Sequence, residues 1–220
     1  MSQDYKIQIE HVLPGEIEKR SFEIITEELE ERGISLDSIQ APVIKRVIHT
    51  TADFDYVENL HFSEHAVEKI QQAIREGACI VTDTNMAKSG INKKELQKYG
   101  GEVYCFMSDE EVAARARANQ STRAVASMEK AAKLSKDREL IFAIGNAPTA
   151  LIRLYELIQE EKITPRGIIG VPVGFVNVVE AKELILDTSI PHIVSRGRKG
   201  GSNVAAAICN ALLYQMRDSL

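Results

Sequence analysis

The chain has 220 residues, a formal net charge of −5 and an apolar fraction of 44%, with few aromatic residues. The length fits one domain spanning residues 1–220 with a full hydrophobic core. The acidic balance argues against a general nucleic-acid binder, but it leaves room for an anionic ligand held by local basic groups. No apolar run approaches the ~20 residues that cross a bilayer, and no secretion signal opens the chain. The three cysteines form no CxxC pair, which favours unpaired thiols in a reducing cytoplasm.

The first two thirds of the chain alternate helical patterns with short apolar runs. Glycines end two of the predicted helices, and a serine offers a cap for one of them. Residues 41–51, APVIKRVIHTT, fit either a strand or a short helix. The other predicted segments are a helix over 14–32 before Gly33, a helix over 63–77 from a Ser63 cap to Gly77, a buried strand followed by a polar loop in 78–91, a helix within 92–99, a strand in 101–107 and a long helical region over 109–136.

The C-terminal third is the most regular part of the chain. Three times, in 140–158, 167–185 and 191–213, an apolar strand runs into a glycine-containing loop and then a helix. Strands that alternate with helices predict βαβ units with right-handed crossovers. The predicted fold is therefore α/β: a three-layer, Rossmann-like arrangement with a mostly parallel sheet and helices on both of its faces.

The three loops of these units are the candidate ligand sites. In such sheets, ligands bind beyond the C-terminal strand ends, where helix N-termini favour anions. The loops place Asn146 near a cap, expose backbone at Gly174, and gather Arg196, Arg198 and Lys199 in SRGRKGGSN. Ordinary turn and capping chemistry explains each loop equally well when it is taken alone. No loop matches GxxxxGK[ST] or GxGxxG, so nucleotide binding is weakly supported.

Other candidates carry less weight. His61 and His65 are four apart, but a helix is expected to start between them, so they make a poor metal pair. Zinc, iron and GxSxG patterns are absent from the sequence. On the residues alone, Ser21 fits a packing position, and Arg20 and Arg123 fit solvated helix positions. The histidine of RVIHTTADFDY likewise fits a buried residue bonded to the backbone.

Seven segments, in order over nearly the whole chain, resemble the precorrin-8X methylmutases of cobalamin biosynthesis. Each segment alone would be a weak signal, whereas together they are specific. The segments are RSFEII (20–25), VIHTTADFD (47–55), VTDTNMAKSGI (81–91), STRAVAS (121–127), AIGNAPTAL (143–151), GVPVGFVNVVEAK (170–182) and IVSRGRKGGSNVAAA (193–207).

The resemblance implies an isomerase that moves a methyl group from carbon eleven to carbon twelve of a polycarboxylate tetrapyrrole. It also implies a homodimer with active sites near the subunit interface, no external cofactor, no metal site and no nucleic-acid or membrane partner. HTTADFD resembles the anaerobic, cobalt-first branch more than the aerobic one. The catalytic acid falls on His49, and the predicted substrate contacts are Arg20, Ser21, Thr50, Arg123, Asn146, Gly174, Arg196 and Arg198.

The chemistry of a methyl shift suits a histidine. Protonating the conjugated macrocycle draws electron density away from the carbon that the methyl group leaves, and an imidazole can hold and release a proton near neutral pH. Thr50 and Thr51 could bond the ligand or the ring, and Asp53 or Asp55 could orient the ring. Two alternatives stay open at this point: a non-catalytic corrinoid carrier and a nucleotide-dependent α/β enzyme such as a methyltransferase.

Overall fold

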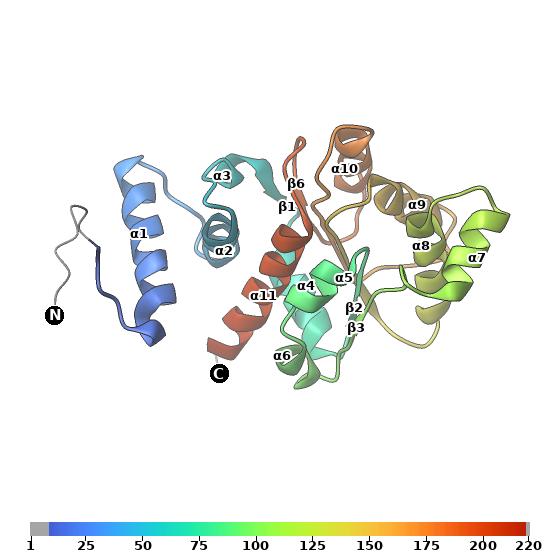
Figure 1. The fold of residues 1–220 in the computed structure, drawn as a ribbon, viewed down its shortest axis with the longest axis horizontal. Coiled ribbons are helices and arrows are strands. Elements are labelled where there is room, and N and C mark those ends of the chain that lie inside the picture. The colour runs from blue at the N-terminus through green and yellow to red at the C-terminus, as the bar shows by residue number, and fades with distance from the viewer. Residues whose placement is uncertain (1–8, 219–220) are drawn as a thin grey trace.

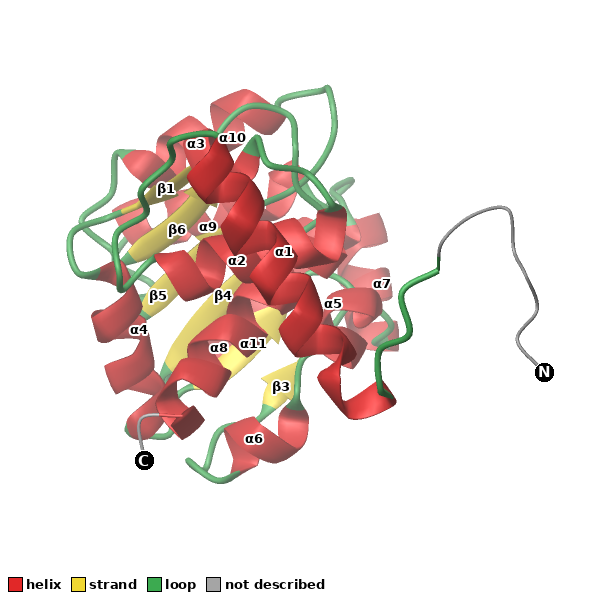
Figure 2. Ribbon diagram, turned by 90° about the vertical axis from the view of Figure 1, so that its left-hand side faces the viewer, coloured by secondary structure: helices red, strands yellow, loops and turns green. Residues whose placement is uncertain are grey.

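A six-stranded sheet lies at the centre of the computed structural model, which describes residues 9–218. The strand order is β1-β6-β5-β4-β2-β3. Strands β2 to β6 are parallel, and β1 pairs antiparallel with β6 at one edge. Figure 2 shows the strands side by side beneath the helices. Their bounds are β1 (Leu60–Phe62), β2 (Cys79–Thr82), β3 (Val103–Tyr104), β4 (Leu140–Ile144), β5 (Gly167–Gly170) and β6 (His192–Ser195).

Helices cover both faces of the sheet, which confirms the predicted three-layer α/β class. One face carries α4 (Ala66–Arg75), α5 (Asn85–Gly90) and α11 (Ser202–Asp218), and the other carries α8 (Arg123–Leu134), α9 (Pro148–Gln159) and α10 (Val178–Leu186). Helix α2 (Ala41–Thr51) packs on α11, and α1 (Ile17–Glu31) lies outside α2 at one end of the molecule (Figure 1). The remaining helical elements are a 3-10 turn (Pro14–Glu16), α3 (Tyr56–Asn59), α6 (Lys93–Gln97) and α7 (Glu110–Ala118).

Strand β4 shows how the sequence separates the two layers of core. Its five residues are all buried. Ile141 and Ala143 belong to the cluster beneath α11, while Leu140, Phe142 and Ile144 belong to the cluster beneath α8 and α9. The continuous apolar run therefore fills both faces of a covered parallel strand.

The segment 41–51 is a helix, so the strand alternative for it is wrong. Pro42 lies in its first turn, where a missing N–H group costs nothing. Val43, Ile44, Val47 and Ile48 are buried, at the spacing of one helical face. The helix ends at Ala52, which has a φ of 53° and donates its N–H to the Ile48 carbonyl. His49 therefore lies in the last turn of a rigid, packed helix.

Four other predicted boundaries need correction. Ser63 does not cap α4; its Oγ accepts a hydrogen bond from the His192 N–H, and α4 begins at Ala66. The region 109–136 contains two helices, because Thr122 caps the second by accepting from the Val125 N–H. Helix α5 occupies part of the expected polar loop after β2, and only Val103–Tyr104 of 101–107 forms a strand.

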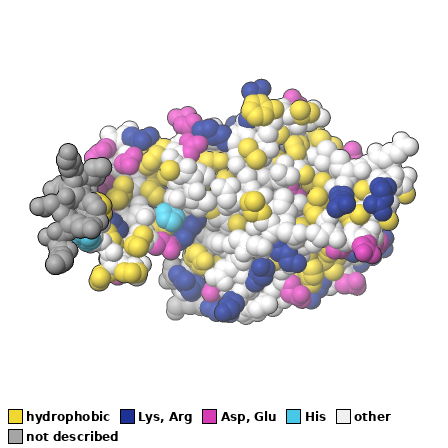
Figure 3. All heavy atoms as spheres, in the orientation of Figure 1, with side chains coloured by type: hydrophobic (Ala, Val, Ile, Leu, Met, Phe, Trp, Pro, Cys, Tyr) yellow, Lys and Arg dark blue, Asp and Glu magenta, His cyan; other side chains and the backbone are white. Residues whose placement is uncertain are grey.

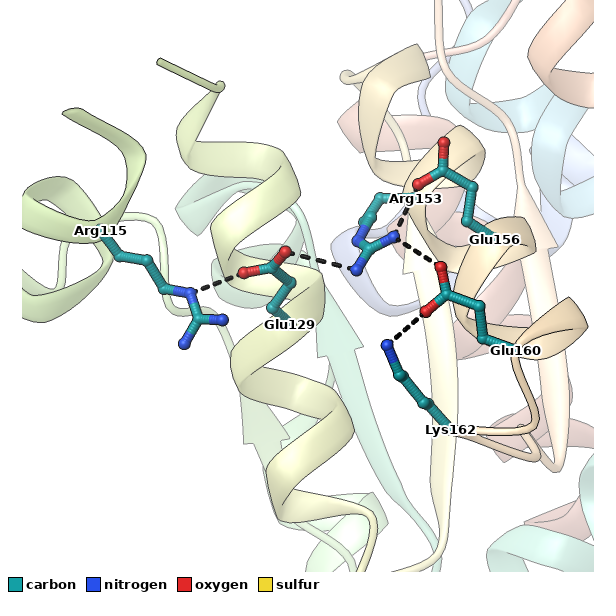
Figure 4. Close-up of polar contacts among 6 residues, drawn as sticks. All are labelled: Arg115, Glu129, Arg153, Glu156, Glu160 and Lys162. Atoms are coloured by element: carbon teal, nitrogen blue, oxygen red, sulfur yellow. Dashed lines mark hydrogen bonds and ion pairs between the residues drawn. The ribbon is translucent and has the colours of Figure 1, made fainter. Parts of the chain in front are cut away.

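An ion-pair network ties α7, α8 and α9 together (Figure 4). Glu129 of α8 lies between Arg115 of α7, at 2.6 Å, and Arg153 of α9, at 3.4 Å. Arg153 also pairs with Glu156 and Glu160. The network holds α8 between α7 and α9.

Cys79, Cys105 and Cys209 are buried and unpaired. Within residues 9–218, no helix has both the length and the apolar content needed to span a bilayer.

Candidate active site

His49 lies at an open cavity of about 530 Å³ between α1 and the end of α2. Its ring stacks on Phe22 of α1, with centroids 5.2 Å apart and planes inclined by 21°. Ser21, Ile24 and Arg32 also line the cavity, together with Glu28 and Phe54. The Arg32 guanidinium lies 4.0 Å from the centre of the Phe54 ring. The cavity therefore combines an exposed imidazole, a hydroxyl, a cation and apolar walls.

The hydroxyl groups near His49 are bonded within their own helices. Ser21 donates to the Ile17 carbonyl, Thr50 to the Arg46 carbonyl and Thr51 to the Val47 carbonyl. Each oxygen keeps acceptor capacity. Ser21 faces the cavity, whereas Thr50 is exposed beside it and is not one of its lining residues.

Asp53 and Asp55 bind Lys199 instead of orienting the His49 ring, so that expectation is wrong. The Lys199 ammonium lies 2.6 Å from a carboxylate oxygen of each. Its hydrogen bond lowers the pKa of Asp53. The Arg196 N–H, in the same loop as Lys199, donates to the Asn59 carbonyl at 2.7 Å. The segment that follows His49 is thus fastened to the loop of residues 196–201 before α11, which we call the arginine loop.

The loops at the C-terminal ends of β5 and β6 are joined through their backbones. The Gly174 N–H donates to the Arg198 carbonyl, and the Gly201 N–H donates to the Val171 carbonyl. A Cβ on Gly200 would lie 2.1 Å from the Val171 carbonyl oxygen, so only glycine permits this approach. The N–H group of the predicted site residue Gly174 is therefore already bonded to the neighbouring loop.

The GNAPT loop before α9 is already occupied by a carboxylate of the protein. Buried Asp83 accepts from the N–H groups of Gly145, Asn146 and Ala147, at 2.9, 2.8 and 2.6 Å. Burial raises the pKa of Asp83, and the three N–H donors oppose that rise. These N–H groups are consequently not available to a ligand carboxylate, contrary to expectation. The exposed Asn146 side chain remains a candidate contact.

A buried lysine supports the arginine loop from below. The Lys182 ammonium donates to the carbonyls of Gly197 and Lys199, both at 2.8 Å. The Ser195 hydroxyl also donates to the Lys199 carbonyl. Burial lowers the pKa of Lys182 to about 8. A neutral amine keeps enough N–H groups for both bonds, so the support survives deprotonation.

We expect Lys182→Met to lower the free energy of unfolding by about 1–3 kcal/mol, because two buried carbonyls lose their donor. Lys182 has a folded pKa of about 8 against an ordinary 10.5. Between these values the unfolded chain binds more protons, so this group adds stability as pH rises. The difference between wild type and Lys182→Met in urea unfolding should therefore widen from pH 8 towards 10.5. The exposed Lys69→Met is the control, and a difference that narrows with pH would contradict the assignment.

The structure gathers some predicted site residues and separates others. Arg196 and Arg198 are exposed on the loop fastened to the His49 segment. Arg20 is turned towards Glu10, Glu23 and Glu27, and it does not line the His49 cavity. Arg123 begins α8, which packs on the opposite face of the sheet from α2, and Figure 1 shows the two helices apart. One chain therefore does not bring Arg123 beside His49.

Sequence reasoning missed four residues that shape this site. Phe22 and Arg32 had no motif of their own, although Phe22 lies inside RSFEII. Asp83 and Lys182 were not singled out either, although they lie inside VTDTNMAKSGI and GVPVGFVNVVEAK. Their full burial was the decisive property, and no residue pattern in the sequence indicated it. Among residues 9–218, no group of His, Cys, Asp and Glu side chains is placed to hold a metal ion.

Comparison with known proteins identifies the family. The sequence profile described as precorrin-8X methylmutase matches residues 16–215. The chain belongs to the precorrin-8X methylmutase family. It is 44% identical over 209 residues to the cobalt-precorrin-8 methylmutase of Salmonella typhimurium, with 94% of this chain and 97% of that protein covered. It is 45% identical over 203 residues to the protein of the same name from Leptospira interrogans, with 90% and 91% covered.

A solved structure agrees with this identification. The precorrin-8x methyl mutase from Thermus thermophilus superposes with a TM-score of 0.83 at 38% sequence identity, covering 93% of this chain and 98% of that one. As a member of the precorrin-8X methylmutase family, the chain is an enzyme, an isomerase of corrin biosynthesis. Its relatives do not favour the carrier alternative.

Proposed function

We propose that the enzyme isomerises cobalt-precorrin-8, moving one methyl group from carbon eleven to carbon twelve of the macrocycle. The cobalt-containing form is preferred here because the relatives described above carry cobalt-precorrin-8 in their names. The cobalt ion belongs to the substrate in this proposal. Residues 1–220 would act as one methylmutase domain in the cytoplasm.

The observation that carries the proposal is the setting of His49. Its imidazole is exposed at a cavity, held by its stack on Phe22, and fixed on a packed helix. It lies in the last turn of α2. Such a group can offer a proton to a bound macrocycle without moving far.

The proposed reaction conserves all atoms of the substrate. His49 donates a proton to the conjugated macrocycle, and the bond between carbon eleven and the methyl group breaks as the bond to carbon twelve forms. The macrocycle then returns the proton to His49. Ser21, on the cavity wall, could accept a hydrogen bond from the substrate edge, because its own proton is donated to the Ile17 carbonyl. Arg196 and Arg198 would hold its carboxylate arms.

A second copy of the chain would complete the site. Arg123 begins α8 and His49 ends α2, two helices that lie on opposite faces of the sheet and apart in Figure 1, although the family resemblance gives both residues a role. Three exposed hydrophobic residues lie on or just before α1: Leu13 precedes it, Ile17 begins it and Ile24 lies at its middle. Ser21 lies between the last two in sequence. A homodimer whose interface includes α1 would cover these side chains and set Arg123 of one copy near His49 of the other.

The test is turnover of cobalt-containing and metal-free precorrin-8, followed by the absorption spectrum of the corrin product. Conversion of the cobalt form at the higher kcat/KM supports the proposal. Binding without conversion of either form would indicate a carrier, and tight nucleotide binding without corrinoid binding would indicate the nucleotide-dependent alternative.

We expect Arg196→Gln and Arg198→Gln each to weaken substrate binding roughly tenfold at low salt, the size of one lost charge-assisted hydrogen bond. The loss should shrink as salt is added, because the Debye length falls to ~10 Å at 0.1 M and screens the wild-type attraction. Titration of wild type and both variants with the substrate at several salt concentrations measures this loss of affinity. Arg166→Gln is the control, because Arg166 directly precedes β5, at the N-terminal ends of the strands, whereas the arginine loop lies at their C-terminal ends. Equal affinity in wild type and both variants at low salt would reject the role.

A further inference from the structure

Three hydrophobic side chains project from the loop between β5 and α10. Phe175 is 81% exposed, Val176 is 79% exposed and Val173 is 47% exposed. Solvent exposure of a phenylalanine and two valines in one short loop costs free energy unless something covers them. The loop itself is well fixed, because Gly174 is bonded to Arg198 and Asn177 leads directly into α10.

The position of this loop points to a ligand. Strand β5 lies between β6 and β4 in the sheet, so its loop lies between the other two candidate loops at the C-terminal edge. The Arg198 guanidinium lies 5.3 Å from the centre of the Phe175 ring. Figure 3 shows hydrophobic and basic side chains together, with acidic atoms beside them, at the top edge of the molecule, near β6 and α10 as labelled in Figure 1.

This surface has the chemistry of one kind of ligand. An apolar platform edged by cations suits a flat molecule with an apolar face and an acidic rim. A protein partner with an apolar patch could cover Phe175 and Val176, but it would leave the cationic rim without acidic partners. The Asp53–Lys199–Asp55 cluster fastens this arginine loop to the segment directly after the helix that carries His49.

We infer that Phe175 and Val176 form the platform on which one face of the corrinoid macrocycle rests, while Arg198, held over the Phe175 ring, takes a carboxylate arm at its rim. The inference rests on the proposed function and adds a substrate-positioning surface to it. Phe175 touches the macrocycle but moves no proton, so its contribution is to binding and orientation.

The test compares Phe175→Ala, Phe175→Leu and Phe175→Tyr in steady-state turnover and in equilibrium titration with cobyrinic acid, the product form of the macrocycle. Phe175→Ala should raise KM and the product Kd roughly tenfold with kcat changed less than about twofold, because it removes binding shared by ground and transition states. Phe175→Tyr should bind like wild type, since it keeps the ring, and Phe175→Leu should fall between.

Ile39→Ala is the matched control, because Ile39 is an exposed hydrophobic residue before the start of α2, away from His49. Sedimentation of each variant separates the alternatives. A Phe175→Ala variant that binds cobyrinic acid as wild type does would overturn the inference while leaving the proposed function intact. A loss of binding that accompanies dissociation of the oligomer would assign the loop to a subunit contact and overturn it too. Failure of the wild type to convert precorrin-8 would instead refute the proposed function.

Discussion

His49→Ala is expected to fold, to bind the tetrapyrrole, and to convert it at least ~100-fold more slowly, the usual size of a lost general acid. Folding should survive because α2 is held by Val43, Ile44, Val47 and Ile48, all buried, whereas His49 is exposed. Binding should survive because the residues proposed to hold the substrate, on the arginine loop and at Phe175 and Val176, are unchanged in this variant. Single-turnover absorption measurements separate binding from conversion.

His49→Asn should behave like His49→Ala, because asparagine keeps hydrogen-bonding groups and loses the titrating proton. His65→Asn is the matched control, since His65 is an exposed histidine before α4, and asparagine tolerates its φ of 54°. A His49 variant that turns over at the wild-type rate would show that the macrocycle receives its proton from another group, or that binding alone drives the shift.

The class of fold and the strands of the C-terminal third were predictable because their signals are local, whereas the short edge strand β1 was not predicted. Buried runs such as LIFAI, followed by glycine and a helical pattern, can form few structures other than a covered parallel strand. The segment 41–51 was ambiguous because it is short, and short apolar runs fit both the helical and the strand periodicity. Its spacing of Val43, Ile44, Val47 and Ile48 nevertheless follows a helix, and packing on α11 decides the outcome.

Contacts between distant segments were not predictable. Lys199 binds Asp53 and Asp55 across 146 and 144 residues of sequence. No sequence pattern in either segment indicates that the two segments are in contact. The sequence led us to expect that the two carboxylates orient the nearby ring of His49, but they bind Lys199 of the arginine loop instead. Residue types therefore indicated which segments carry chemistry, while tertiary structure decided which groups remain available for a ligand.

Asp83 offers the second test, because it is the clearest case of a polar group committed to the fold. Asp83→Asn should lower the free energy of unfolding by about 2–3 kcal/mol, since the amide cannot accept from all three N–H groups and leaves at least one unsatisfied. Asp83→Ala should cost more, because it satisfies none of them and also removes the negative charge at the start of α9.

Urea unfolding measures both variants, with a lower midpoint at an unchanged slope as the expected signature. The exposed Asp137→Asn, after α8, is the matched control and should unfold as wild type does. Conversion should also fall in Asp83→Asn, because the Gly145 backbone lies so close to the arginine loop that a Cβ there would be 2.7 Å from the Gly201 carbonyl oxygen. A shift of the GNAPT loop would therefore misplace Arg196 and Arg198. Equal urea midpoints for Asp83→Asn and wild type would mean that the GNAPT loop is held by other contacts, and its N–H groups would again be candidates for a substrate carboxylate.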